Sequence, residues 1–347
     1  MHVPAFRAVE GCQVVAICAS SQERASAAAE RLSIPLAFGE WSALVESEAI
    51  DAISIAVPPT LQTKVALAAI QAGKHILCEK PVAMCAEDAL RLYAAACQAG
   101  ITHGVDFMFP ELPVWHQAKR LIDSGAIGKL RHATLQWRVE TRANRFRVDS
   151  WKVRPTEGGG ALYNFVPHVF YNLEWLLGPI VRLTGRVSSR EGFLENLAEG
   201  WLELRGGIPV SFSVATDAVA GSGHHLEVYG DDGALALRNE TGDYTHGFEL
   251  WVGHRMTGWE REAVPDTALN SQPSAPSDRV TAMAPLAQRF IRAIVDRKPF
   301  TPGLGEGVRV QQLLDLLRDS ALSEQWNTAP APDDSIRLTT LTSTDGV

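Results

Sequence analysis

The stretch Cys-Glu-Lys-Pro-Val-Ala-Met at residues 78–84 decides the fold of this chain. It follows a short apolar run and precedes a segment with helical periodicity. A strand that ends in Glu79-Lys80-Pro81 would place a lysine ammonium at the carboxyl edge of a sheet. Open α/β sheets bind their ligands at that edge, so the stretch predicts both a sheet and a ligand site beside it.

Strands and helices alternate on both sides of this stretch. Strands are predicted at 13–18, 51–57, 74–78 and 101–106, and helices at 22–31, 41–46, 61–72, 86–98 and 112–123. Alternation at this spacing is typical of a parallel, doubly wound sheet. We therefore expect a Rossmann-like α/β dinucleotide-binding domain over residues 1–126.

The pattern changes near residue 129, where long half-buried strands begin. Strands are predicted at 129–140, 180–188, 198–205, 209–216, 223–229 and 233–238, and helices at 160–177, 282–296 and 304–325. Residues 262–280 are typical of an exposed loop, and the segment after Asn327 is polar. This predicts an α+β domain with a large, mostly antiparallel sheet over 127–326, which binds substrate and forms oligomers, and then a loose tail over 327–347.

The bulk composition excludes several classes of protein. Of the 347 residues, 46% are hydrophobic and 21% are charged, and the net charge is −8. An acidic balance disfavours nucleic acid and anionic membranes as partners, and no run approaches the roughly 18 apolar residues of a membrane span. No signal-peptide pattern is visible, so we expect a cytoplasmic protein. The five cysteines lack metal-ligand spacing and predict reduced thiols and no metal site.

Further motifs accompany residues 78–84 in a fixed order. They are Val57-Pro58-Pro59 after a strand, Asp-Ser-Gly-Ala-Ile-Gly-Lys at 123–129, Gly-Gly-Gly-Ala-Leu at 158–162 with His168, and Val-Tyr-Gly-Asp-Asp-Gly-Ala-Leu at 228–235. In this order and spacing, the chain resembles the glucose–fructose oxidoreductase / inositol dehydrogenase / rhizopine catabolism (Gfo/Idh/MocA) family of oxidoreductases. The resemblance covers nearly the whole chain, to about residue 326.

The resemblance implies a segment that this sequence does not contain. Family members open with a strand and a G-x-G-x-x-G turn, whose backbone and following helix bind the cofactor pyrophosphate. Residues 2–9 match only the end of that helix, so about 15 residues, one strand with its turn, are missing. Loss of a central strand would expose strand edges and apolar surface. We therefore expect a misplaced start or a shortened chain rather than a genuine loss.

The resemblance assigns the chemistry to Lys80 and His168. In family members the lysine of the Glu-Lys-Pro motif binds the substrate hydroxyl, and the histidine exchanges the hydroxyl proton while hydride moves to nicotinamide. Asn164 stands where the family has an aspartate, one helical turn before His168, so it can bind and orient substrate but cannot act as a base. A solvated surface lysine and a buried core histidine are the alternative interpretations.

The residues after the first strand indicate which cofactor is bound. NAD-binding proteins place an acidic residue there to hold the ribose 2′-hydroxyl, whereas this chain has Ala19-Ser20-Ser21 with Arg24 nearby. This predicts NADP as the cofactor, with NAD as the alternative. The other interpretation is that the two serines only form a turn and that Arg24 is a solvated helix residue. The resemblance adds further cofactor-binding residues: Val57, Pro58, Pro59, Gln62, Glu79 and Lys80.

A basic segment follows the strand at 129–140. It contains Arg138, Arg142, Arg145, Arg147, Lys152 and Arg154, with Trp137 and Trp151. In relatives this segment lies near the substrate opening, so Arg154 and Trp151 are predicted to bind substrate. Several arginines would suit a carboxylate or phosphate on that substrate. The alternative is a solvated loop that balances an acidic protein.

These patterns favour an NAD(P)-dependent dehydrogenase or reductase. It would transfer hydride between nicotinamide and a secondary hydroxyl or keto group of a sugar, cyclitol or sugar-derived acid. Two alternatives stay open: a non-enzymatic sensor on the same fold, and a redox-neutral, glycosidase-like enzyme that oxidises its substrate transiently. Family members usually pair through the open face of the second-domain sheet, so we expect a homodimer or homotetramer.

Overall fold

A computed structural model describes residues 1–146, 148–189, 195–241, 247–264 and 279–332. The chain divides into two compact units. The first comprises Met1–Asp106 with Met283–Val308, and the second comprises Phe107–Ala282 with Arg309–Val347. The divisions at 282/283 and 308/309 fall inside the two long helices α10 (Arg279–Asp296) and α11 (Leu304–Ser323).

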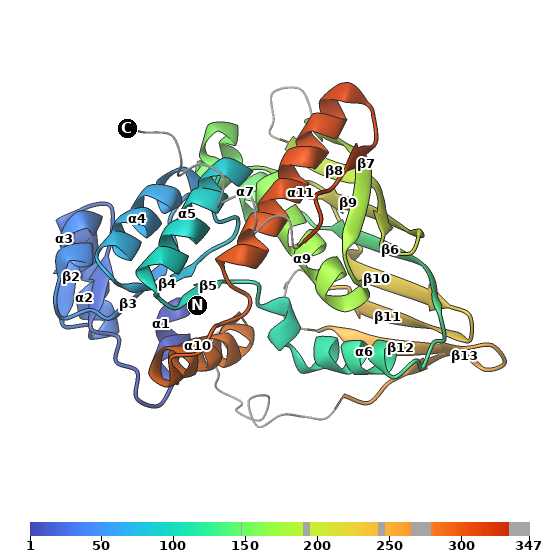
Figure 1. Ribbon diagram of the computed structural model, residues 1–347, viewed down its shortest axis with the longest axis horizontal. Helices are drawn as coiled ribbons and strands as arrows, with labels where there is room; N and C mark the ends of the chain where they lie inside the picture. Colours follow the sequence, from blue (N-terminus) through green and yellow to red (C-terminus); the bar gives the residue numbers. More distant parts are fainter. Residues whose placement is uncertain (147, 190–194, 242–246, 265–278, 333–347) are drawn as a thin grey trace, which may run out of the picture. The chain divides into compact units, whose positions relative to one another are not determined.

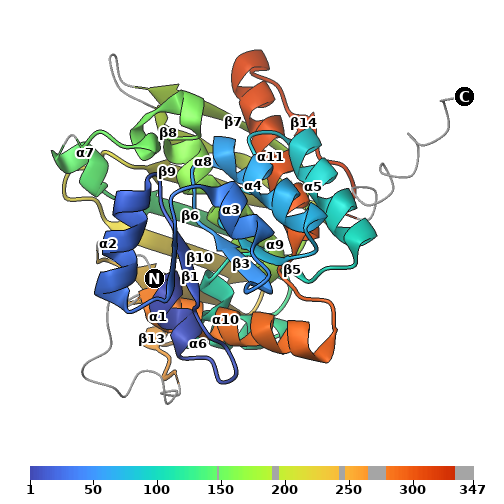
Figure 2. The same cartoon turned by 90° about the vertical axis from the view of Figure 1, so that its left-hand side faces the viewer.

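The first unit has the parallel strands and alternating helices that the sequence predicts, with one further strand, β2, that was not predicted. Its strands are β1 (Ala16–Cys18), β2 (Leu36–Phe38), β3 (Ala52–Ile55), β4 (His75–Cys78) and β5 (His103–Val105). Its other helices are α1 (His2–Arg7), α2 (Gln22–Leu32), α3 (Trp41–Glu46), α4 (Pro59–Gln71) and α5 (Ala86–Ala99). Helix α4 packs against β3 and β4 and lies beside α5 (Figure 1), and α2 and α3 contact β1 and β2 (Figure 2). The expected Rossmann-like fold is confirmed.

The parallel strands form two separate sheets. One contains β1 and β2, and the other has the order β3-β4-β5. β1 therefore pairs with β2 alone and β3 with β4 alone, which leaves one edge of each strand without a strand partner among the described residues. Ser54 in β3 is exposed, whereas its neighbours Ile53 and Ile55, which point to the opposite face, are buried.

The second unit is built on one nine-stranded sheet with the order β13-β12-β11-β10-β6-β9-β8-β7-β14. Its strands are β6 (Leu130–Arg138), β7 (Ile180–Ser189), β8 (Glu195–Leu204), β9 (Ile208–Ala215), β10 (Gly223–Gly230), β11 (Gly233–Asn239), β12 (Glu249–His254), β13 (Gly258–Arg261) and β14 (Asn327–Thr328). All neighbours pair antiparallel except β6 and β9. The mostly antiparallel sheet is confirmed, and β12 to β14 extend it beyond the strands predicted.

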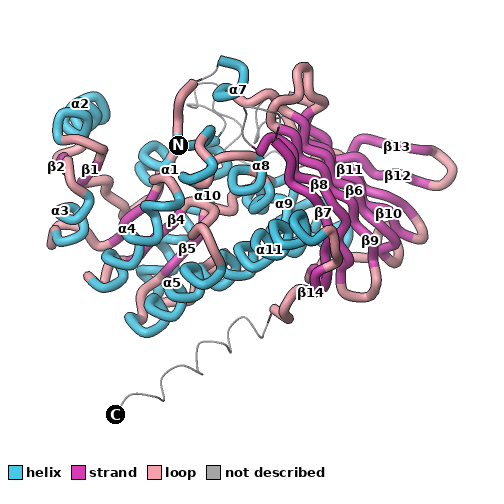
Figure 3. The backbone as a smooth tube through the Cα atoms, turned by 90° about the horizontal axis from the view of Figure 1, so that it is seen from above, coloured by secondary structure: helices cyan, strands magenta, loops and turns pink. Residues whose placement is uncertain are grey.

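Helices cover one face of this sheet. Figure 3 shows α8 (Ala161–Asn164), α9 (Val166–Leu177) and α11 on the same side of the strands. The residues of β9 that face the helices, Val210, Phe212 and Val214, are buried, whereas the alternate residues Ser211 and Ser213 are partly exposed. This alternation is typical of an antiparallel sheet with one covered face. The remaining elements are η1 (Phe109–Glu111), α6 (Pro113–Asp123), α7 (Arg142–Phe146), η2 (Trp151–Val153) and η3 (Pro155–Glu157).

The helix predicted over 160–177 is wrong in one respect, because it is interrupted at Phe165. Pro167 lies in the first turn of α9, where its ring fixes its own φ and it has no N–H to donate to the preceding turn. A proline is tolerated at a helix start and not in a helix interior, so the chain begins a second helix there. Asn164 and His168 therefore do not share the face of one continuous helix.

Two segments bear on other expectations. Within the loop predicted over 262–280, residues 265–278 lie outside the described residues, and so do residues 333–347 of the tail. The start of the tail is ordered, since Asn327 and Thr328 pair with β7. No helix in the described part of the chain combines the length and the apolar character needed to cross a membrane.

Candidate functional site

The carboxyl ends of the parallel strands gather the candidate cofactor residues of the first unit. Ala19, Ser20 and Ser21 follow β1, Val57 and Pro58 follow β3, and Glu79 and Lys80 follow β4. Parallel strands present their carboxyl ends at the same edge of a sheet, which is where open α/β folds bind ligands. The predicted residues thus lie at the carboxyl edge of their sheets.

Ser20, Ser21 and Arg24 form an exposed group after β1. The Ser21 hydroxyl accepts a hydrogen bond from the Arg24 backbone N–H at 3.3 Å and thereby caps α2. The Arg24 guanidinium donates to the Ser20 hydroxyl at 3.1 Å. The serines turn the chain and at the same time hold a cationic guanidinium beside two hydroxyls.

The segment after β3 divides into exposed and buried parts. Val57 and Pro58 are partly exposed, whereas Pro59 and Gln62, in the first turn of α4, are buried. The Gln62 amide nitrogen donates to the backbone oxygens of Glu79 at 2.7 Å and of Pro81 at 2.8 Å. Gln62 therefore contacts the Glu-Lys-Pro turn directly, a contact that the sequence pattern does not reveal.

The Glu-Lys-Pro turn continues β4 and is anchored to its neighbours. The Glu79 N–H donates to the Ile55 oxygen of β3 at 3.0 Å, and the Lys80–Pro81 peptide bond is cis. Lys80 is partly exposed, while Pro81 is buried. Burial, with the nearby charge of Glu79, raises the pKa of the Cys78 thiol to about 12, so this thiol remains neutral. Lys80 is thus the partly accessible basic group on an otherwise fixed turn.

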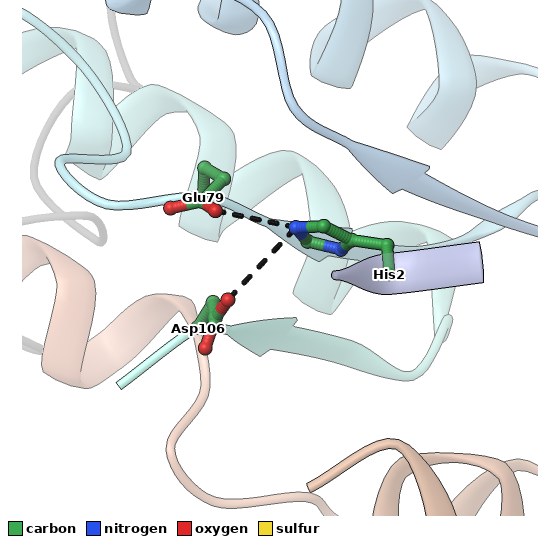
Figure 4. A group of neighbouring side chains, drawn as sticks. All are labelled: His2, Glu79 and Asp106. Carbon is green, nitrogen blue, oxygen red and sulfur yellow. Dashed lines mark hydrogen bonds and ion pairs between the residues drawn. The ribbon is translucent and has the colours of Figure 1, made fainter. Parts of the chain in front are cut away.

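A cluster that sequence reasoning missed surrounds Glu79. His2, at the start of α1, lies 3.2 Å from Glu79 Oε1 through Nε2 and 2.7 Å from Ser54 Oγ through Nδ1 (Figure 4). Its Nε2 is also 4.0 Å from Oδ2 of Asp106, which is fully buried. Burial lowers the pKa of His2, but the hydrogen bond to Glu79 and the charges of Glu79 and Asp106 outweigh it, so the pKa is raised from 6.5.

The ligand atoms of His2, Glu79 and Asp106 lie within 4.8 Å of one another, a spacing that a metal ion could bridge. The 3.2 Å contact between His2 Nε2 and Glu79 Oε1 is itself a hydrogen bond, and this bond and the charges of Glu79 and Asp106 raise the pKa of His2. His2, Glu79 and Asp106 therefore form a cluster of charged groups in which His2 is hydrogen-bonded to Glu79. In the sequence, the only signal for this cluster is a histidine, His2, at the start of the first helix.

In the second unit, His168 lies in aromatic surroundings on α9. It is 5% exposed, and its ring centroid is 5.0 Å from that of Phe109, 6.3 Å from Phe107 and 6.3 Å from Trp137. All three contacts are edge-on or tilted, which is the favoured geometry for aromatic pairs. The imidazole is thus held firmly by apolar rings. Asn164 is partly exposed, and its amide donates to the Gly160 oxygen at 2.9 Å.

A second histidine, His224 on β10, joins the same aromatic cluster and was not predicted. Its ring stacks on Trp137 with centroids 4.3 Å apart and planes 4° apart. Burial, with a smaller contribution from His225, lowers its pKa to about 3. His224 is therefore neutral at physiological pH, and its packing rather than its charge defines its role in the fold.

The predicted substrate residues Trp151 and Arg154 lie in and after η2. Arg154 is exposed and donates to Asp149 Oδ2 at 2.7 Å and to Glu157 Oε1 at 2.9 Å. The guanidinium holds the pKa of the Asp149 carboxyl below its usual value. Trp151 is partly exposed, with the Lys152 ammonium 5.8 Å from its ring. The charge of Arg154 is thus balanced by neighbouring carboxylates. Arg147 of the predicted basic segment lies outside the described residues.

The fold implies a dinucleotide, and the first unit fits its two ends. Ser20, Ser21 and Arg24 offer donors for an adenosine ribose or its phosphate, and the turn after β4 offers Lys80 for the nicotinamide end. Residues 1–15, which precede β1, contain a single glycine, Gly11, and no glycine-rich turn for a pyrophosphate.

Family models match both units. The model described as "Oxidoreductase family, NAD-binding Rossmann fold" (Gfo/Idh/MocA) matches residues 1–107, and the model of the C-terminal domain of the same family matches residues 115–236. An uncharacterised oxidoreductase of Synechocystis sp. is 30% identical over 351 residues, which cover 96% of this chain and 94% of that protein.

Named relatives act on sugars. Levoglucosan dehydrogenase of Pseudarthrobacter phenanthrenivorans is 24% identical over 353 residues, covering 90% of this chain and 89% of that protein. A solved structure of levoglucosan dehydrogenase in complex with NADH and levoglucosan has a TM-score of 0.81 at 23% identity, and the match covers 91% of this chain and 90% of that chain. At 23% identity the likeness to this solved structure supports the fold alone, and membership of the family rests on the family models.

Proposed function

The chain belongs to the Gfo/Idh/MocA family of oxidoreductases, and on that premise we propose that it is an NAD(P)-dependent enzyme that transfers hydride between nicotinamide and a secondary hydroxyl of a sugar. The observation that carries the proposal is the Glu-Lys-Pro turn, which is fixed at the carboxyl end of β4 and leaves Lys80 partly exposed. Lys80 is assigned to bind the reacting hydroxyl, and His168 is assigned to exchange its proton.

Each assigned residue has a physical role in that reaction. Bound nicotinamide would supply the hydride acceptor. The Lys80 ammonium would donate a hydrogen bond to the hydroxyl oxygen and stabilise the negative charge that develops as the proton leaves. A neutral imidazole nitrogen of His168 would accept that proton, and the aromatic rings around it would fix its orientation. Asn164 would orient the substrate without ionising.

We propose a neutral sugar rather than a sugar acid as the substrate. Arg154, the predicted partner of a substrate carboxylate, already donates to Asp149 and Glu157. An acidic substrate would have to compete with these two carboxylates, whereas a neutral polyol would not. We therefore expect higher turnover with glucose or levoglucosan than with glucuronate.

The cofactor proposal is NADP, with NAD as the alternative. Arg24 is exposed and donates to the Ser20 hydroxyl, and none of residues 19–21, directly after β1, is acidic. The variant Arg24→Ala should raise the KM for NADP by about tenfold or more, since it removes one charge-assisted phosphate contact, and leave the KM for NAD unchanged. An equal effect on both cofactors would exclude this role.

The open face of the nine-stranded sheet is proposed as the surface of a homodimer or homotetramer. Trp201 on β8 is 57% exposed, and it lies between two cross-strand ion pairs, Arg186–Glu199 and Arg182–Glu203. A large exposed aromatic with flanking charges suits a subunit interface. Light scattering should give a mass that is a multiple of the monomer's, and Trp201→Glu should lower it.

Turnover tests the catalytic proposal. Oxidation of a panel of sugars and cyclitols is followed at the nicotinamide absorbance band with the wild type, Lys80→Ala and His168→Ala. Both variants should lose about 10²-fold or more in kcat, as is typical when a general acid or base is removed. Full activity of Lys80→Ala would overturn the assignment of Lys80. Cleavage of glycosides without net reduction of the cofactor would instead favour the glycosidase-like enzyme that oxidises its substrate transiently.

A further inference from the structure

Gln62 reaches from α4 to the backbone on both sides of Lys80. Its side chain is 1% exposed, and its amide nitrogen donates to the Glu79 oxygen at 2.7 Å and to the Pro81 oxygen at 2.8 Å. The orientation of the amide is fixed by its neighbours, because both are carbonyl oxygens and only an N–H can satisfy them. One side chain thus bridges the residues immediately before and after Lys80.

This arrangement leaves one polar atom of Gln62 without a hydrogen bond, which is energetically unfavourable. With both N–H groups directed at the turn, the Gln62 Oε1 is buried and has no hydrogen-bond partner among the described residues. A buried acceptor without a partner is unfavourable and calls for an explanation. A residue kept only for packing would fill the same space without this cost. The two bonds to the turn are therefore the feature that the glutamine supplies.

Hydrogen bonds hold the turn on both sides of Lys80. Pro81 has no N–H, so its backbone can form a hydrogen bond only through its carbonyl oxygen. The Glu79 N–H fixes the turn to β3 on the strand side, at 3.0 Å from the Ile55 oxygen. The two bonds from Gln62 fix it on the far side of Lys80 as well. The chain is consequently restrained on both sides of Lys80, at the carbonyl of Glu79 before it and at the carbonyl of Pro81 after it.

We propose that Gln62 is a positioning residue for Lys80. By bonding to the carbonyl oxygens of Glu79 and Pro81, it fixes the direction in which the Lys80 side chain leaves the turn. Misplacement of a reacting group by about 1 Å can cost about 10²-fold in rate, so loss of this bridge would be felt in turnover. The inference rests on the proposed function, in which Lys80 binds the reacting hydroxyl.

Three variants test the bridge. Gln62→Met keeps the length and removes both N–H donors, and Gln62→His restores a single N–H on a neutral imidazole. Gln71→Met is the matched control, since Gln71 is exposed at the end of the same helix. The graded series distinguishes loss of the bridge from general damage to α4, and Gln62→His serves if Gln62→Met does not fold.

Two readouts need neither cofactor nor substrate. Hydrogen exchange of peptides covering residues 78–84 should accelerate in the order wild type, Gln62→His, Gln62→Met. The acylation rate of Lys80, followed across pH by peptide mass spectrometry, should change in the same order. Gln71→Met should match the wild type in both, and a folded Gln62→Met that also matches would overturn the proposal.

Kinetics separate this inference from the proposed function. Gln62→Met should lower kcat by about 10²-fold with little change in the KM for the cofactor, and Gln62→His should fall between it and the wild type. If Lys80→Ala keeps its activity, the proposed function fails whatever the Gln62 variants do. If Lys80→Ala is inactive while Gln62→Met turns over like the wild type, the positioning role fails alone.

Discussion

Replacement of His224 by phenylalanine should remove a large part of the acid sensitivity of the second unit. His224 is 2% exposed and stacked on Trp137, and Phe109 and Phe248 contact its ring with centroids 5.7 Å and 5.3 Å away. Neither ring nitrogen has a hydrogen-bond partner among the described residues. A proton on this ring would be buried among apolar neighbours without a counter-charge, which is strongly unfavourable.

The magnitude follows from the pKa of His224. Burial, aided by His225, lowers that pKa from 6.5 to about 3 in the folded protein. Below pH 6.5 the unfolded chain takes up a proton that the folded chain does not, so stability is complete above 6.5 and falls as the pH drops toward 3. Each pH unit within this window costs about 1.4 kcal/mol, so the loss from about pH 7 to about pH 5 should be about 2 kcal/mol.

Urea unfolding at these two pH values measures the loss. The wild type should lose about 2 kcal/mol more of unfolding free energy than His224→Phe over the same change in pH. His225→Phe is the matched control, because His225 is the next residue of β10, is less buried and faces the opposite side of the sheet. If His224→Phe and the wild type lost the same free energy on acidification, the reasoning about the buried imidazole would be refuted.

Three further changes test other parts of the fold. Arg309→Met should cost about 3–5 kcal/mol in chemical unfolding, because it removes a guanidinium that is 2.7 Å from Glu174 and almost fully buried; a cost near zero would contradict this. Gly223→Ala should destabilise by about 1–3 kcal/mol or more, since the residue has φ +89° and a Cβ would lie 1.9 Å from a backbone oxygen; an unchanged Tm would contradict this. Glu79 raises the pKa of His2, so the protonated His2 stabilises the fold fully below pH 6.5, and this stabilisation is lost as the pH rises through the folded-state pKa. His2→Gln should flatten the Tm profile over this pH range, and an unaltered profile would contradict the assignment.

Regular hydrophobic patterns made most of the fold predictable from the sequence. The apolar run Asp51–Val57 contains β3, and the alternation at 129–140 contains β6. Patterns failed where elements are short or interrupted. β13 is mostly exposed and has no apolar run that would mark it as a strand, and the break at Phe165 depends on a single proline within an otherwise helical apolar run.

The site could be predicted only where a motif marks it. Glu79 and Lys80 were identified because Glu-Lys-Pro follows a strand, and the fold places them at the carboxyl end of that strand. The contact of Gln62 with the same turn joins residues 17 and 19 positions apart, and the contact of His2 with Glu79 joins residues 77 apart. Such contacts are set by how helices pack on the sheet, which no local pattern encodes.

The central claim is that this chain moves hydride from a sugar carbon to nicotinamide. The most direct measurement uses a neutral sugar carrying deuterium at the carbon that is oxidised, with mass spectrometry of the cofactor after turnover. The account predicts that the reduced cofactor carries the deuterium with the wild type, and that Lys80→Ala forms about 10²-fold less of it. Unlabelled reduced cofactor, or no reduced cofactor with any sugar of the panel, would contradict it.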